Sequence, residues 1–187
     1  SAAYPNSPTG SNQLTSFETP TDWADNMGQR VRGYIHPPVT GQYRFWIASD
    51  DEGQLRLSTN RDPANATLIA GVPQWSGPRE WNKFPQQTSS LITLQAGQSY
   101  YVEALMKEGA GADNLAIAWA TPGSSTPVVI AGQYLSPWVN NSPPLLTNPG
   151  NRVHVIGSPL NVNVIASDAN NDPLTYSASA LPTGLSI

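Results

Sequence analysis

The sequence predicts an all-β protein, and three observations indicate this class. Charged residues make up only 12% of the 187-residue chain, well below the share that helix-rich globular domains carry. The chain contains 18 prolines and 15 glycines, which favour turns and interrupt helices. Several segments alternate apolar and polar residues with a period of two, which is the pattern of a strand with one buried face. We therefore expect a β-sandwich or barrel of eight or more strands.

Turn sequences such as "PVTG", "LQAG" and "TPGSS" separate the predicted strands at roughly hairpin spacing. In "GQYRFWIAS" the side chains of Tyr43, Phe45 and Ile47 fall on one face, so this face is expected to point into the core. Residues 1–23 are polar and rich in proline, and we interpret them as an extended lead-in docked on the domain. The predicted strands are 30–37, 41–49, 53–59, 66–72, 90–95, 98–107, 114–120 and 127–132.

The composition shifts near the end of the chain and predicts a domain boundary there. We expect a first domain over residues 1–138, a linker rich in proline and asparagine over 139–150, and a partial second domain over 151–187. The last segment is shorter than the roughly 100 residues of an immunoglobulin sandwich. Its alternating apolar residues Leu160 and Val162 would therefore lack a partner sheet within the chain.

Charge and cysteine content exclude several classes of function. The net charge is −4 and no basic cluster lies along the sequence, so nucleic acid is not the expected partner. The chain has no cysteine, which excludes disulfides, thiolate metal sites and a cysteine nucleophile. No apolar run approaches the roughly 20 residues that span a membrane. We expect a piece of a secreted or cell-surface protein that does not insert into the membrane and is stabilised by calcium rather than by disulfides.

The stretch "WIASDDEGQLRLS" places three acidic side chains, Asp50, Asp51 and Glu52, between two apolar segments. Adjacent carboxylates repel one another, and one Asp followed by Gly serves a tight turn equally well. The cluster is therefore either the solvated tip of a hairpin or a site for a cation. Side chains of consecutive strand residues point to opposite faces, so directing both Asp50 and Asp51 at one ion requires a departure from strand geometry.

Three motifs in order resemble a bacterial PA14 domain over residues 20–138. They are "GQYRFWIASDDEGQLRLST", "YYVEALMKEGAGADNLAIAW" and "IAGQYLSPW". The resemblance implies a β-sandwich that occurs in adhesins, toxins and carbohydrate-active enzymes, with lectin members that bind sugars through a calcium ion. It also implies a cis peptide bond between Asp50 and Asp51, which form the first ion-binding loop.

The second ion-binding loop that the resemblance implies is "KEGAGADNL", residues 107–115. Asp113 would add a third carboxylate to calcium and a carbonyl near Gly111 would add a further ligand, while the main-chain amide near Ala112 would contact the sugar. We expect Glu52 and Glu108 to face solvent.

The remaining candidates each have a structural alternative. Trp46 and Trp119 lie within predicted strands and are interpreted as core, whereas Trp75 and Trp81 lie in a long loop and are candidate platforms for a sugar. Residues 151–187 resemble an immunoglobulin-like, cadherin-related repeat. Within them Asp168, Asn170 and Asp172 have the alternate spacing of a calcium loop, which Asx turns share.

Catalysis finds little support in the sequence. His36 and His154 lie in different predicted domains, and no G-x-S-x-G elbow or phosphate-binding glycine loop is present. Asp50 and Asp51 on one ion would lie too close for a glycosidase pair. We expect a binding protein rather than an enzyme: a calcium-dependent lectin that binds glucose- or fucose-like hexoses of cell-surface glycans. The alternative is a structural or protein-binding module in which calcium only joins loops.

Overall fold

The computed structural model describes residues 7–139, 143–151, 153, 155, 157–169, 173–181, 183–184 and 186. The chain divides into two compact units, Ser1–Trp138 and Val139–Ile187. None of the helical turns in these described residues is long and apolar enough to cross a lipid bilayer.

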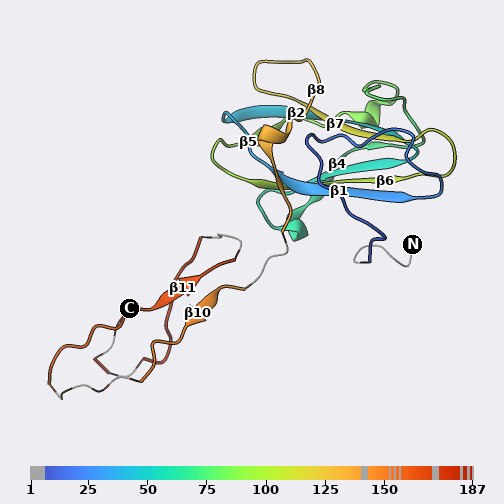
Figure 1. The fold of residues 1–187 in the computed structure, drawn as a ribbon. Coiled ribbons are helices and arrows are strands. Elements are labelled where there is room, and N and C mark those ends of the chain that lie inside the picture. The colour runs from blue at the N-terminus through green and yellow to red at the C-terminus, as the bar shows by residue number, and fades with distance from the viewer. Residues whose placement is uncertain are drawn as a thin grey trace. The chain divides into compact units, whose positions relative to one another are not determined.

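Two antiparallel sheets form the first unit, and they lie as two layers in Figure 1. The larger sheet has the strand order β4-β3-β6-β1-β9, and the smaller sheet has the order β5-β2-β7-β8. The strands of the larger sheet are β1 (Gly28–Ile35), β3 (Gly53–Leu57), β4 (Thr67–Val72), β6 (Tyr100–Lys107) and β9 (Leu135–Pro137). The strands of the smaller sheet are β2 (Gly41–Asp50), β5 (Ile92–Leu94), β7 (Asn114–Ala120) and β8 (Val128–Val129). Three short 3₁₀ turns, η1 (Pro63–Asn65), η2 (Pro85–Gln87) and η3 (Gly132–Tyr134), lie in the connections.

The core lies between the two sheets and consists of the inward faces of their strands. Tyr43, Phe45 and Ile47 of β2 are completely buried, so the alternation in the sequence predicts this face correctly. Trp119 of β7 packs its ring on Tyr43 at 5.1 Å between centroids and on Tyr134 at 5.3 Å. Each of these large aromatic rings buries much apolar area, so the three rings contribute strongly to the stability of the core.

All eight predicted strands are present, with ends that differ by a few residues. Strand β9 was not predicted because it is short and contains a proline, and its pairing with the edge of β1 is a tertiary contact. The lead-in does dock, as expected: the amide of Phe17 donates to the carbonyl of Ile130 at 2.9 Å, and the Phe17 side chain is buried.

Strands β2 and β3 are consecutive in the sequence but belong to opposite sheets. Strand β2 pairs with β5 and β7, whereas β3 pairs with β4 and β6. The acidic turn between them therefore crosses from one layer to the other and is not a hairpin tip, which excludes that interpretation of the stretch. Gly53 approaches Ser49 closely at the crossing, because a Cβ added to Gly53 would lie 2.6 Å from the Ser49 side chain.

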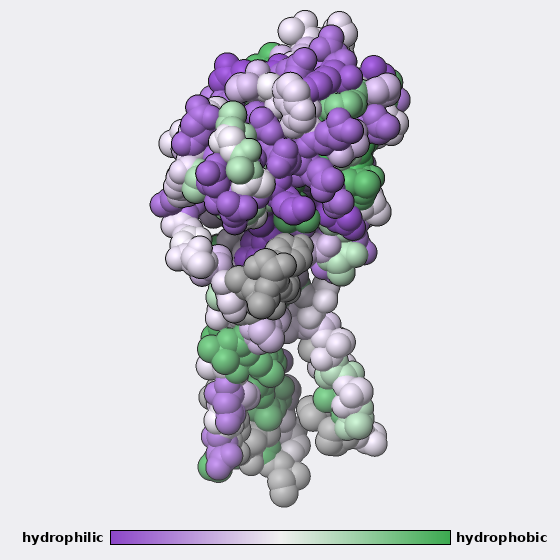
Figure 2. Space-filling model, turned by 90° about the vertical axis from the view of Figure 1, so that its right-hand side faces the viewer, coloured by the Kyte–Doolittle hydropathy of each residue, from purple (hydrophilic) through white to green (hydrophobic). Residues whose placement is uncertain are grey.

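Among its described residues, the second unit contains one small sheet, in which β10 (Leu145–Thr147) pairs antiparallel with β11 (Ile165–Ser167). Leu160 and Val162 are 43% and 39% exposed, as expected for an apolar face without a partner sheet. Figure 2 shows hydrophobic residues gathered on the surface of this unit. The predicted residues Asn170, Asp172 and His154 lie outside the described residues.

We expect the Gly53→Ala substitution to lower the free energy of unfolding by about 1–3 kcal/mol, because the added methyl group overpacks the crossing against Ser49. Urea unfolding measures the effect. Gly28→Ala is the matched control, since its Cβ would lie 3.7 Å from the Met106 carbonyl oxygen, an ordinary contact. Equal stability of the two variants would contradict the proposed steric constraint.

Candidate functional site

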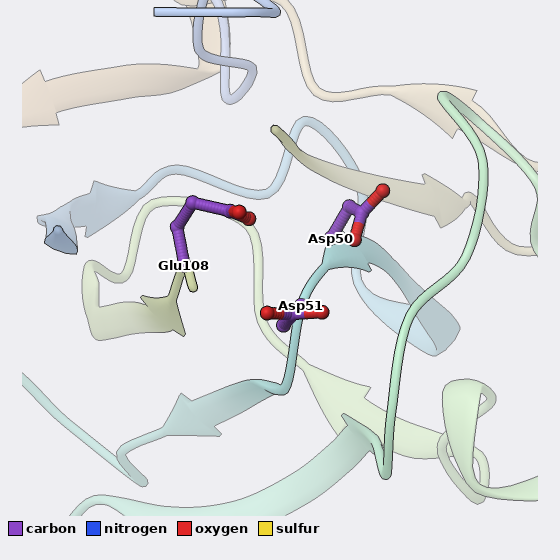
Figure 3. Close-up of side chains that lie close together, drawn as sticks. All are labelled: Asp50, Asp51 and Glu108. Atoms are coloured by element: carbon purple, nitrogen blue, oxygen red, sulfur yellow. The ribbon is translucent and has the colours of Figure 1, made fainter. Parts of the chain in front are cut away.

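Three carboxylates from two connections meet at one end of the first unit. Each of Asp50, Asp51 and Glu108 offers an oxygen, and these three oxygens lie within 4.8 Å of one another. Figure 3 shows Glu108 extending from the segment after β6 towards the turn that carries Asp50 and Asp51. We call these three residues the carboxylate triad. Asp50 and Asp51 are adjacent in the sequence, whereas Glu108 follows Asp50 by 58 positions and only the fold brings it to the other two.

Backbone contacts hold the two aspartates in place. Asp50 ends β2 opposite Asn114 of β7, and the peptide bond between Asp50 and Asp51 is cis, as the resemblance implies. The hydroxyl of Ser49 donates to the carbonyl oxygen of Asp51 at 2.9 Å. The amide of Gly109 donates to Oδ2 of Asp51 at 3.0 Å, and a Cβ on Gly109 would lie 3.1 Å from the same oxygen.

Glu108 is buried, so the expectation that it faces solvent is wrong. It is 3% exposed, and its Oε2 atom has no hydrogen-bond partner among the described residues. The inward face of β6 carries the even-numbered residues Val102, Ala104 and Met106, and Glu108 continues this alternation beyond the strand. The period-two pattern of the sequence therefore contained the signal for an inward Glu108. Glu52, by contrast, is exposed as expected.

The second loop places its predicted residues close to the triad but not within it. Asp113 is 1% exposed, and its Oδ2 accepts from the amides of Trp23 at 2.5 Å and Ala24 at 3.0 Å. Its Oδ1 has no partner in the part of the chain that the structure describes. Gly111 and Ala112 are exposed.

Asn114, which the sequence analysis did not single out, follows Asp113 and pairs with Asp50 across the sheet. Its amide nitrogen donates to the Ser76 carbonyl at 2.9 Å, and its Oδ1 is buried without a partner. With Glu108 and Asp113, it brings three buried, unpartnered side-chain oxygens to this end of the unit.

Burial and like charges make ionisation of Asp50 and Glu108 unfavourable. Burial, and then the neighbouring Asp51 carboxylate, raise the pKa of Asp50, while Lys83 opposes the rise. Burial, followed by the charges of Asp51, Asp50 and Asp113, raises the pKa of Glu108. Carboxylates that are difficult to ionise together gain most from a bound cation. The donor set consists of oxygen atoms alone, which suits a hard divalent cation such as calcium.

Comparison with known proteins identifies the family of the first unit. Residues 8–133 match the PA14 domain. The chain belongs to the PA14 domain family. The predicted resemblance to a PA14 domain is confirmed for this unit. The bacterial origin and the immunoglobulin-like resemblance of residues 151–187 stay predictions.

Relatives of the PA14 domain occur in proteins of different kinds. The mouse protein N-acetyl-beta-glucosaminyl-glycoprotein 4-beta-N-acetylgalactosaminyltransferase 1 is 36% identical over 111 residues, which is 57% of this chain but 11% of that relative. The solved structure of an anti-sigma factor domain-containing protein covers 69% of this chain and 42% of its own, with a TM-score of 0.51 and 16% identity. The PA14 sugar-binding domain from an RTX adhesin covers 62% and 56%, with a TM-score of 0.46 and 19% identity.

An aromatic side chain borders the carboxylate triad of the PA14 domain. Trp75 forms an isolated bridge with Asp50 and is 50% exposed. The ammonium group of Lys83 lies 2.7 Å from the centroid of its ring and is itself buried without a hydrogen-bond partner. Trp75, one of the two candidate sugar platforms, is therefore exposed and lies beside Asp50. Trp81 instead packs against Trp46 on the outer face of the smaller sheet.

The raised pKa of Glu108 predicts how pH changes the stability of the metal-free PA14 domain. The folded state holds the proton more tightly than the unfolded state does, so the stabilising effect of protonation is present at low pH. It is lost as pH rises from the ordinary value of 4.5 through the raised pKa. We expect Glu108→Gln, which cannot ionise, to be more stable than the parent at neutral pH, with a smaller difference in acid.

Urea unfolding in EDTA at several pH values measures this difference. Glu52→Gln is the matched control because Glu52 is exposed, and it should leave the pH profile unchanged. A Glu108→Gln stability difference independent of pH would contradict the buried charge.

Proposed function

We propose that the PA14 domain is a calcium-dependent carbohydrate-binding module. The observation that carries this proposal is the convergence of Asp50, Asp51 and Glu108 within 4.8 Å at a partly exposed end of the sandwich. Three buried or half-buried carboxylates are costly to keep together. A divalent cation converts their repulsion into attraction.

The residues fit calcium in number and in kind. Calcium takes roughly 6 to 8 oxygen ligands. The triad supplies three carboxylates, and the unpartnered oxygens of Asp113 and Asn114 lie on the neighbouring loop and strand. In this proposal Asp50, Asp51 and Glu108 hold the ion, and Asp113 and the carbonyl of Gly111 complete the site from the second loop.

Bound calcium would supply attachment points for the vicinal hydroxyl oxygens of a sugar. Asp50 and Asp51 are half-buried rather than fully enclosed, so their outer oxygens can accept from the same hydroxyls. Ala112 is exposed, and its main-chain amide can donate a further hydrogen bond to the sugar. The exposed part of the Trp75 ring suits the apolar face of a pyranose. These groups favour simple hexoses, including glucose- and fucose-like sugars.

The proposed binding is weak and not catalytic. Few hydrogen bonds to a small ligand, less the entropy of fixing it, suggest a dissociation constant on the order of 1 mM, about −4 kcal/mol. Useful adhesion would then require many copies on one secreted or cell-surface protein. The alternative function, a structural module whose calcium only joins loops, differs in having no calcium position open to a sugar.

We expect calorimetry to detect one calcium ion per chain, with Asp51→Asn weakening binding at least about tenfold because a charged ligand is lost. Glu108→Gln should weaken binding similarly. Glu52→Gln is the control with the same loss of charge on an exposed side chain. Unchanged calcium affinity in Asp51→Asn would remove this residue from the proposed site.

We expect saturation-transfer NMR with free hexoses to show binding in calcium and none in EDTA. Binding that survives EDTA would show that calcium is not the attachment point. Calcium binding without any sugar signal at high sugar concentration would replace the lectin proposal with the structural alternative.

A further inference from the structure

The larger sheet of the PA14 domain gathers cations that the sequence keeps apart. Its five strands carry four cations and one acidic residue, Glu103, although the whole chain has 9 cations and 13 acidic residues. Val31 and Ile35 of β1 face the core, so Arg30 and Arg32 point to the opposite, outer face. By the same alternation Arg56 of β3 lies on this outer face. The cations of these strands are Arg30, Arg32, Arg56 and Lys107.

The register places three of these arginines around a single carboxylate. Glu103 of β6 pairs with Arg32 on one side and with Arg56 on the other. Nε of Arg30 lies 3.9 Å from Oε2 of Glu103, and the hydroxyl of Tyr101 donates to the same oxygen at 2.9 Å. One negative charge thus stands among three positive ones. We call Arg30, Arg32, Arg56 and the neighbouring Arg61 the arginine face.

Burial and neighbouring positive charge both act on groups of this face. Burial, and then the charge of Arg30, lower the pKa of Arg32. Burial, and then Arg61, lower the pKa of His36, which directly follows β1. An additional anion would therefore be attracted to this face.

The guanidinium groups are held in position rather than extended freely into solvent. The guanidinium carbon of Arg32 lies 3.3 Å from the centroid of a Trp138 ring, and that of Arg61 lies 4.5 Å from the Tyr34 centroid. Nη2 of Arg56 donates to the Ala66 carbonyl at 3.0 Å. Groups that are already ordered lose less entropy when they bind a ligand.

We propose that the arginine face binds an acidic polysaccharide, through the carboxylate or sulfate groups of its sugars. The planar guanidinium fork matches such oxyanions in a bidentate manner. Adjacent strands lie about 4.8 Å apart, so the backbones of Arg32 and Arg56 are about 10 Å apart across the sheet. A linear polyanion with repeated acidic groups can contact several of these cations together. This site is separate from the carboxylate triad and requires no calcium.

Two other kinds of partner fit the arginine face less well. Single-stranded nucleic acid binds largely by stacking bases on exposed aromatic rings, but Tyr34 and Tyr101 are only 5% and 3% exposed. Protein partners usually insert apolar or aromatic anchors into pockets. The arginine face instead offers charged groups over the half-buried ring of Trp138 and the buried ring of Tyr34.

The test uses the full chain in EDTA, which removes any contribution from calcium. Binding is measured to polygalacturonate, dextran sulfate and uncharged dextran, at low and at physiological ionic strength. We expect at least one acidic polysaccharide to bind, more weakly as salt rises, and uncharged dextran not to bind. The carboxylate and sulfate arms distinguish the two sources of negative charge.

Three variants separate binding at the arginine face from non-specific attraction. We expect Arg32→Gln with Arg56→Gln to weaken binding roughly tenfold, the loss expected for two partly exposed ion pairs. Arg44→Gln is the matched control, because Arg44 is an exposed arginine on β2 of the other sheet. Arg56→Gln alone, expected to give a smaller loss, serves if the double variant does not fold.

Several results would overturn the proposal. They are the absence of binding to both acidic polysaccharides, an equal loss in Arg44→Gln, or an unchanged affinity in the arginine-face variants. Equally tight binding of polyglutamate or single-stranded DNA would also overturn it, since the face would then not select a polysaccharide.

Discussion

The pairing of β2 with β7 in one sheet and of β3 with β6 in the other is the constraint on which the site depends. It makes the turn at Asp51 and Glu52 cross the end of the sandwich. The same pairing sets Asp50 opposite Asn114 and Gly53 opposite Met106. Glu108 follows Met106 by two residues on the same inward face, so the register of the two sheets brings the third carboxylate to the crossing.

Hydrogen bonds at the crossing reinforce this arrangement. The Lys107 amide donates to the Glu52 carbonyl at 3.0 Å, and the Glu108 amide donates to the Met27 carbonyl at 2.8 Å. Ser49 and Ser76 are completely buried and bond to each other's backbone at the end of β2. Loops fixed in this way to a rigid sandwich can present polar groups without large rearrangement on binding.

The net charge of −4 conceals an uneven distribution of charge over the PA14 domain. Carboxylates meet at one end of the sandwich, where burial and mutual repulsion raise the pKa of Glu108. Arginines gather on the outer face of the larger sheet around Glu103. In our two proposals a cation binds at the first region and an anion at the second, so one small domain would offer two surfaces of opposite electrostatic character.

The sequence by itself determined eight strands of the PA14 domain, all but β9, and the face of β2 that forms its core, because a period of two is a local property of the chain. The Asp50–Asp51 pair was also visible, since its members are adjacent. Only the tertiary structure decided that β2 and β3 lie in different sheets, that Glu108 joins the aspartates, and that Arg32 and Arg56 flank one carboxylate. Alternation tells which face a side chain occupies but not which strand lies beside it, and that choice depends on how the two sheets pack around a common core.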